Sequence, residues 1–118
     1  MKNNNEPKGT KEQRLSKRIT PTQKVTIENT LTGETLGTVS NINETGFMIY
    51  GKNTLEEEGV YQLQLVLSQA VEGRFHVVFG GECLWTKQGD GGEQWAGIQI
   101  IDIAEDDALC LKNIVREF

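Results

Sequence analysis

The sequence has 118 residues and a mass of 13.2 kDa, a size that accommodates one folded domain with at most a short tail. Hydrophobic residues make up 36% of it and charged residues 25%, which excludes a chain disordered throughout. No apolar run approaches the roughly 18–20 residues that cross a bilayer, and the polar N-terminus lacks the apolar segment of a secretory signal. We therefore expect a cytoplasmic protein without a membrane span.

Charge is distributed unevenly along the chain. Residues 1–24 carry seven basic and two acidic side chains, a balance of +5, whereas residues 25–118 carry five basic and fifteen acidic ones, a balance of −10. An acidic body disfavours duplex nucleic acid as a partner, because a phosphate track needs a basic face. The basic segment suits a small anion, although a tail that is simply solvated or rests on the acidic body is an open alternative.

The N-terminal region divides in two by composition. Residues 1–12 are polar and lack periodicity, which predicts a disordered tail. Residues 13–21 are basic and only weakly apolar, which predicts a flexible arm that leads into the domain. The domain itself, arm included, is expected to span residues 13–118.

Alternating apolar and polar residues follow Pro21 and predict β-structure. Six runs of this kind are expected as strands, at residues 25–28, 35–42, 47–50, 60–67, 74–86 and 94–103. Gly80-Gly81 interrupts the fifth run and predicts a bulge or a barrel corner. Because short connections favour antiparallel neighbours and closure removes exposed edges, we expect an all-β fold, a small six-stranded antiparallel barrel.

The period changes near the C-terminus. Asp102 and Glu105 have the spacing of a capping box, and the residues that follow have helical spacing, which predicts a helix over residues 103–117. The stripe expected to pack on the barrel consists of Ala108, Leu111, Ile114, Val115 and Phe118.

Catalytic and metal-binding patterns are weak. His76 lies within a strand pattern, and no second histidine or Cys-x-x-Cys pair accompanies it to bind zinc. Cys83 and Cys110 lie in apolar surroundings and are expected to be reduced, packed thiols; an enzyme with Cys83 as nucleophile is the alternative, which no local base supports. We predict a protein that is not an enzyme and has neither metal nor cofactor.

Two short motifs flank the first predicted hairpin. Arg14-x-x-x-Arg18 lies on the basic arm, and Asn41-x-Asn43-x-x-Gly46 lies between the second and third predicted strands. Each motif is common in isolation, so the information is in their order and in their position around one hairpin.

These motifs resemble those of the PilZ domain, the bacterial receptor module for cyclic di-GMP, which has Arg-x-x-x-Arg on an N-terminal arm and Asp/Asn-x-Ser-x-x-Gly at the rim of a six-stranded split barrel. The resemblance extends over residues 13–118. It includes the glycine-bounded strand at residues 63–67, Cys83-Leu84-Trp85, the segment 97–100 and a closing helix. Asn43 departs from the pattern, because it stands where the family usually has serine.

The resemblance implies cyclic di-GMP as ligand, with an effector protein as the partner that reads the bound state. Arg14 and Arg18 would clamp the nucleotide through guanine edges and phosphates. Asn41 and Asn43 would offer their amides, and Gly46 would adopt a positive φ and permit close approach. Weaker ligand-binding candidates are Lys17 and Trp85. The alternatives are a degenerate PilZ adaptor that binds no nucleotide and a small OB-like barrel for single-stranded nucleic acid.

Overall fold

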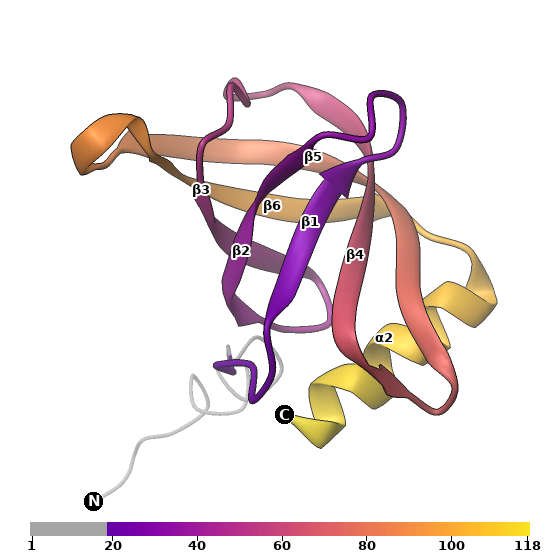
Figure 1. The fold of residues 1–118 in the computed structure, drawn as a ribbon. Coiled ribbons are helices and arrows are strands. Elements are labelled where there is room, and N and C mark those ends of the chain that lie inside the picture. The colour runs from indigo at the N-terminus through magenta and orange to yellow at the C-terminus, as the bar shows by residue number, and fades with distance from the viewer. Residues whose placement is uncertain (1–18) are drawn as a thin grey trace, which may run out of the picture.

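A computed structural model describes residues 19–118 of the chain (Figure 1). The tail at 1–12, most of the predicted arm, and the candidates Arg14, Lys17 and Arg18 lie outside the described residues. The elements, in chain order, are β1 (Val25–Asn29), β2 (Thr35–Ile42), β3 (Gly46–Gly51), β4 (Val60–Val71), β5 (Arg74–Gln88), the 3-10 turn η1 (Asp90–Gly92), β6 (Gln94–Asp102) and α2 (Glu105–Glu117).

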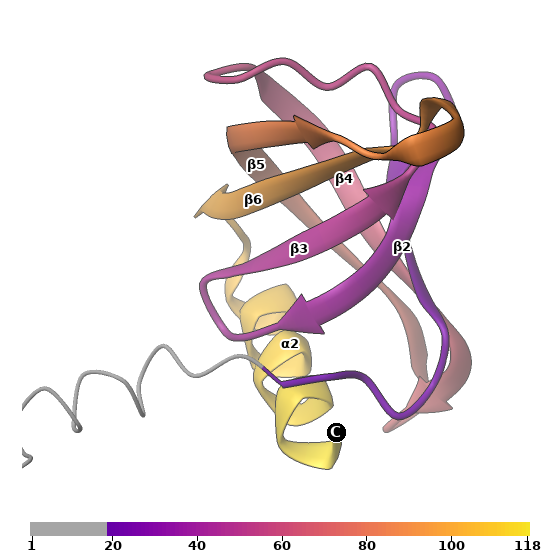
Figure 2. The same cartoon turned by 90° about the vertical axis from the view of Figure 1, so that its left-hand side faces the viewer.

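The strands form a closed barrel in the order β1-β2-β3-β6-β5-β4, and every neighbouring pair is antiparallel. Helix α2 lies across one end of this barrel in both views (Figures 1 and 2), while the tip of the β5–β6 hairpin projects beyond the opposite end. The predicted fold, a six-stranded antiparallel barrel with one C-terminal helix, is confirmed.

The barrel interior follows from the alternation of each strand. In β4 the buried side chains are Leu63, Leu65 and Leu67, and the residues between them are more exposed. The rings of Phe47 and Phe79 meet inside the barrel, with 5.0 Å between their centroids. Because each such side chain removes apolar surface from water, worth about 1.5–3 kcal/mol apiece, this interior is the main source of stability.

Five register shifts interrupt the strand pairs of the described barrel, and three of them concern the predicted break and the site described below. The shift between Gly80 and Gly81 in β5 confirms the predicted break. At Gly81 a Cβ atom would come within 2.9 Å of the Ile98 side chain, so the missing side chain lets β5 pack closely on its neighbour. The two shifts near the site fall between Val39 and Asn41 in β2 and between Cys83 and Trp85 in β5.

Helix α2 closes the barrel end with its apolar side. Its buried residues are Cys110, Leu111, Ile114 and Val115, so the predicted stripe is largely right but omitted Cys110. The predicted start was wrong: the helix begins at Glu105, and its N-cap is Ala104, without a side-chain cap hydrogen bond. Asp102 does not cap the helix because it still belongs to β6, where it pairs with Gly80.

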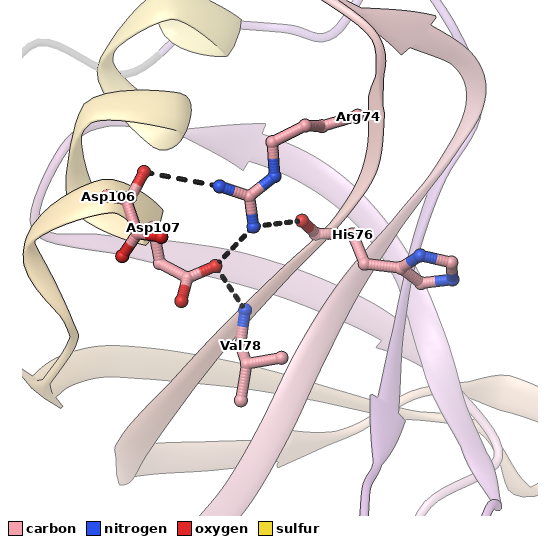
Figure 3. A network of polar contacts seen from close by, with 5 residues as sticks. All are labelled: Arg74, His76, Val78, Asp106 and Asp107. Carbon is pink, nitrogen blue, oxygen red and sulfur yellow. Dashed lines mark hydrogen bonds and ion pairs between the residues drawn. The ribbon is translucent and has the colours of Figure 1, made fainter.

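A polar network fixes the first turn of α2 to β5 (Figure 3). The Arg74 guanidinium donates to the Asp107 carboxylate at 2.7 Å and to the backbone oxygens of Asp106 and His76 at 3.3 and 3.2 Å. The same Asp107 oxygen accepts from the Val78 N–H at 3.3 Å. Pairing with Asp107 raises the pKa of Arg74. This network therefore links the start of α2 to the first residues of β5.

Candidate ligand-binding site

Asn43 closes the turn between β2 and β3 with its side chain and with its backbone N–H, which donates to the Gly46 oxygen at 3.0 Å. Its carboxamide oxygen accepts hydrogen bonds from the Thr45 N–H at 2.8 Å, the Thr45 hydroxyl at 2.8 Å and the Gly46 N–H at 3.0 Å. The side chain is 5% exposed. This is an Asx turn, in which a short polar side chain replaces a backbone acceptor. A serine hydroxyl makes the same kind of turn, so asparagine here is chemically close to the residue that the PilZ pattern has.

Gly46 permits a close approach between strands. The expected positive φ was wrong, because Gly46 is not among the described residues that have one. A Cβ atom at this position would collide with the backbone oxygen of Ile98 and lie 3.3 Å from the Gln99 Cα atom. Glycine is therefore required for β3 to pair closely with β6, next to the turn.

The N-terminal arm enters the described structure beside this turn. Ile19 forms an isolated antiparallel bridge with Ile42: the Ile19 N–H donates to the Ile42 oxygen at 2.8 Å, and the Ile42 N–H donates to the Ile19 oxygen at 2.9 Å. Ile19 directly follows Arg18 in the sequence, and Ile42 directly precedes Asn43. The bridge thus links the residue that follows one motif to a residue within the other.

Asn41 and Trp85 lie on one transverse row across the outside of the barrel. Asn41 of β2 pairs with Met48 of β3, Met48 pairs with Gly97 of β6, and Gly97 pairs with Trp85 of β5. Directly paired residues present their side chains on the same face. Met48 is half-buried between the buried Phe47 and Ile49, which identifies this face as the outer one.

Two of these positions reach the outer face only because of bulges. Strict alternation would place Asn41 with the buried Val39, and Trp85 with the buried Cys83, inside the barrel. The register shifts between Val39 and Asn41 and between Cys83 and Trp85 each add one residue and turn the later side chain outward. Asn41 and Trp85 are accordingly both partly exposed.

The Trp85 indole lies over the backbone of Gly97, and a Cβ atom there would collide with its Nε1 atom. At the Asn41 end of the row, the Asn41 amide nitrogen lies 4.0 Å from the Met48 sulfur atom. The row therefore contains, in order, the Asn41 amide, the Met48 thioether, the Gly97 backbone without a side chain, and the Trp85 indole. Planar ligands with polar edges suit such a surface.

Cys83 lies beneath this face with its side chain completely buried, and its thiol donates to the Trp85 backbone oxygen at 3.4 Å. Burial raises the pKa of this thiol above its ordinary value of 9.0. A nucleophilic cysteine needs a lowered pKa and exposure, so the geometry argues against a Cys83 nucleophile. Within residues 19–118, no group of three metal-ligating side chains gathers, and no helix is long and apolar enough to cross a membrane.

The structure brings four sequence candidates onto one side of the barrel: Asn41, Asn43, Gly46 and Trp85. Met48 and Gly97 connect them and were missed by the sequence reasoning. Met48 belongs to no motif, and Gly97 was noted only as part of the segment 97–100. Their place in the row depends on the register of the strand pairs, which alternation alone does not give.

The fold is PilZ-like. The chain is similar to the inhibitor of motility MotI/DgrA of Bacillus subtilis (TM-score 0.63, 13% identity) and to MrkH of K. pneumonia in its apo state (TM-score 0.64, 12% identity), each match covering 85% of this chain and 48% of the other. It is also similar to the PilZ domain of CeSA from a cellulose-synthesizing bacterium, with a TM-score of 0.55, 14% identity, and coverage of 85% of this chain and 95% of that one.

This chain thus spans about half the length of MotI/DgrA and of MrkH. No protein-family model and no curated protein sequence matches it. The similarity is therefore one of architecture, and it extends over the barrel as a whole.

Proposed function

We propose that this protein is a cytoplasmic receptor for cyclic di-GMP that captures the dinucleotide between its N-terminal arm and the outer face of the barrel. The receptor then signals through contact with an effector protein. The proposed contacts are made by Arg14 and Arg18 of the arm, with Lys17 as an auxiliary cation, and by Asn41 and Trp85 of the barrel face.

The observation that carries the proposal is the bridge between Ile19 and Ile42. Arg18 directly precedes Ile19 in the sequence, and one peptide unit spans about 3.8 Å, so the basic arm is joined directly to a residue hydrogen-bonded to the end of β2. A guanidinium on a long side chain attached there has the reach to meet a ligand on the Asn41 row.

The ligand chemistry fits this arrangement. Cyclic di-GMP has two phosphates and two guanines, and a guanidinium can bind a phosphate through two parallel hydrogen bonds or fork onto guanine O6 and N7. The acidic body does not attract an anion by itself, so the basic arm has to supply the positive charge.

Asn43 has a supporting role in this proposal. Its carboxamide oxygen is engaged by the Thr45 and Gly46 groups of the turn. Asn43 therefore affects ligand binding indirectly, because it fixes the conformation of the end of β2. Gly46 also acts indirectly, because it allows β3 to pair closely with β6.

The test is calorimetric titration of the full chain with cyclic di-GMP, with GTP and cyclic di-AMP as controls. We expect selective binding at micromolar concentration or tighter. Arg18→Ala should weaken binding by roughly tenfold to a hundredfold, the effect of losing one or more hydrogen bonds from a charged group at about 1.5–3 kcal/mol each. Lys112→Gln, which removes an exposed charge from α2, is the matched control and should change nothing.

Absence of binding heat, together with an unchanged melting temperature at high ligand concentration, would overturn the proposal in favour of the adaptor that binds no nucleotide. The two tryptophans on the outer face favour a second candidate, a barrel for single-stranded nucleic acid. Titration with a short oligothymidylate separates the two, because a nucleotide receptor should not bind it.

A further inference from the structure

A hollow lies beside the Asn41 row, toward the projecting β5–β6 hairpin. It has a volume of about 380 Å³ and is lined by Met48, Trp85, Lys87 and Trp95. We call these four residues the shelf. The volume lies within the roughly 300–1,000 Å³ that is usual for small-molecule sites. Most of the surface is apolar, and Lys87 provides one positive charge at its edge.

Register explains why these side chains meet. Trp95 of β6 pairs with Lys87 of β5 on one side and with Tyr50 of β3 on the other, one pleat away from the Met48–Gly97–Trp85 pairs. Outward-facing residues two apart along a strand are neighbours on the same face. The shelf is therefore continuous with the row that contains Asn41, and Met48 and Trp85 belong to both.

Trp95 is held in place by its cross-strand neighbour on the same face, Tyr50. Its ring packs on Tyr50, with 4.4 Å between the centroids and 43° between the ring planes. The Tyr50 hydroxyl in turn donates to a Glu93 carboxylate oxygen at 3.4 Å, and the Tyr50 ring abuts Gly89. An indole held in this way presents a fixed aromatic surface, and binding a flat ligand costs it little conformational freedom.

We propose that the shelf is a base-stacking site, in which Trp95 and Met48 hold a purine of the bound nucleotide and Lys87 contacts an adjacent phosphate. The inference rests on the proposed function and extends it to Trp95 and Lys87. Three features support a purine: two indoles and a polarisable thioether for its faces, a cation at the edge for its phosphate, and continuity with the Asn41 row.

The chain has two tryptophans, so the fluorescence of Trp85 and that of Trp95 can each be measured in a variant that lacks the other indole. Trp85→Phe leaves Trp95 as the single indole, and Trp95→Phe leaves Trp85. Each variant is titrated with cyclic di-GMP while tryptophan emission and calorimetric heat are recorded in parallel. We expect the emission of Trp95 in the Trp85→Phe protein to change in step with the heat, because a stacked base quenches or shifts it.

Affinity provides the second measurement. Trp95→Ala should weaken binding at least about fivefold, the lower limit for loss of one base–aromatic stack. Lys87→Gln should weaken it about threefold to tenfold and reduce its dependence on salt, while Lys112→Gln on α2 should do neither. Because Lys87 is exposed, its replacement leaves the fold intact and keeps the test valid if Trp95→Ala destabilises the protein.

The possible failures are distinguishable. Binding heat with unchanged Trp95 emission, and with Trp95→Ala and Lys87→Gln both within twofold of wild type, would overturn the shelf and leave the receptor proposal standing. No binding heat from the wild-type protein would overturn both.

Discussion

The turn at Asn43 and the shelf around Trp95 lie on the same barrel but use their side chains in opposite ways. Asn43 is buried, and its acceptor oxygen satisfies two backbone N–H groups and one hydroxyl of its own turn. The shelf residues are partly exposed or exposed, and they line an open hollow. A residue in a recognition motif can thus act by shaping the backbone, while in our proposal the contact surface includes Met48, Lys87 and Trp95, which no motif selected.

The largest stability effect that would test this comparison is expected from Asn43→Ala. The change leaves the Thr45 and Gly46 N–H groups without their acceptor, and an unsatisfied buried polar group costs about 1–3 kcal/mol. We expect the free energy of unfolding to fall by about 2–4 kcal/mol in urea denaturation. Asn43→Asp keeps the acceptor oxygens and should recover most of the loss. A loss below about 0.5 kcal/mol in the alanine variant would mean that the turn does not depend on Asn43.

A smaller effect is expected on the shelf side from Gly97→Ala. The new methyl group collides with the Trp85 indole and displaces it, at a cost typical of overpacking, about 1–3 kcal/mol. The Trp85 emission spectrum of a Trp95→Phe background should shift, because the ring leaves its place over the strand. If emission and stability both stay unchanged, the indole does not lie on Gly97.

Asn43→Ser should have a still smaller effect. A serine hydroxyl closes a turn of the same kind with fewer hydrogen bonds, so we expect a loss of about 0.5–1.5 kcal/mol in unfolding free energy. Affinity for cyclic di-GMP should stay within about threefold of wild type, since the proposed contacts lie elsewhere. A large loss of affinity at unchanged stability would show that the Asn43 amide contacts the ligand itself.

The smallest effect concerns pH and the residue beneath the shelf. Burial raises the pKa of Cys83 above 9.0, so the folded state holds this proton more tightly than the unfolded state does. Stability from this source is complete below pH 9 and declines as the pH rises from 9 through the folded-state pKa. Urea denaturation between pH 7 and 11 should show the decline, and Cys83→Val should reduce it. An identical decline in the valine variant would assign it to other groups, Cys110 among them, whose pKa is raised by burial as well.

Much of the fold was predictable because local pattern and tertiary structure agree. Strand β2 has the bounds that its alternation predicts, and the Gly80-Gly81 break is a true register shift. The helix start was not predictable from the capping signal at Asp102. The pairing of Asp102 with Gly80, 22 positions earlier in the chain, extends β6 through the residue that local sequence assigns to a cap.

The residues that meet on the outer face were harder to predict from the sequence than the fold was. Motif resemblance selected Asn41 and Trp85, but strict alternation would have placed both inside the barrel. The bulges that turn them outward carry no sequence signal of their own, and Met48, Lys87 and Trp95 meet only through the pairing of β3, β5 and β6. A site assembled across strands in this way requires the register to be known.

The bridge between Ile19 and Ile42 also determines the length of chain that separates Arg18 from the first anchored residue. If β1 were the first anchored element, the seven peptide steps from Arg18 to Val25 would allow a span of roughly 23–25 Å. With Ile19 anchored, Arg18 is one peptide from a fixed point in the sequence. In the proposed receptor its encounter with a nucleotide on the barrel would therefore be intramolecular and local. Tethering of this kind corresponds to a high effective concentration of guanidinium at the site. The two backbone hydrogen bonds of the bridge would therefore contribute to ligand affinity without touching the ligand.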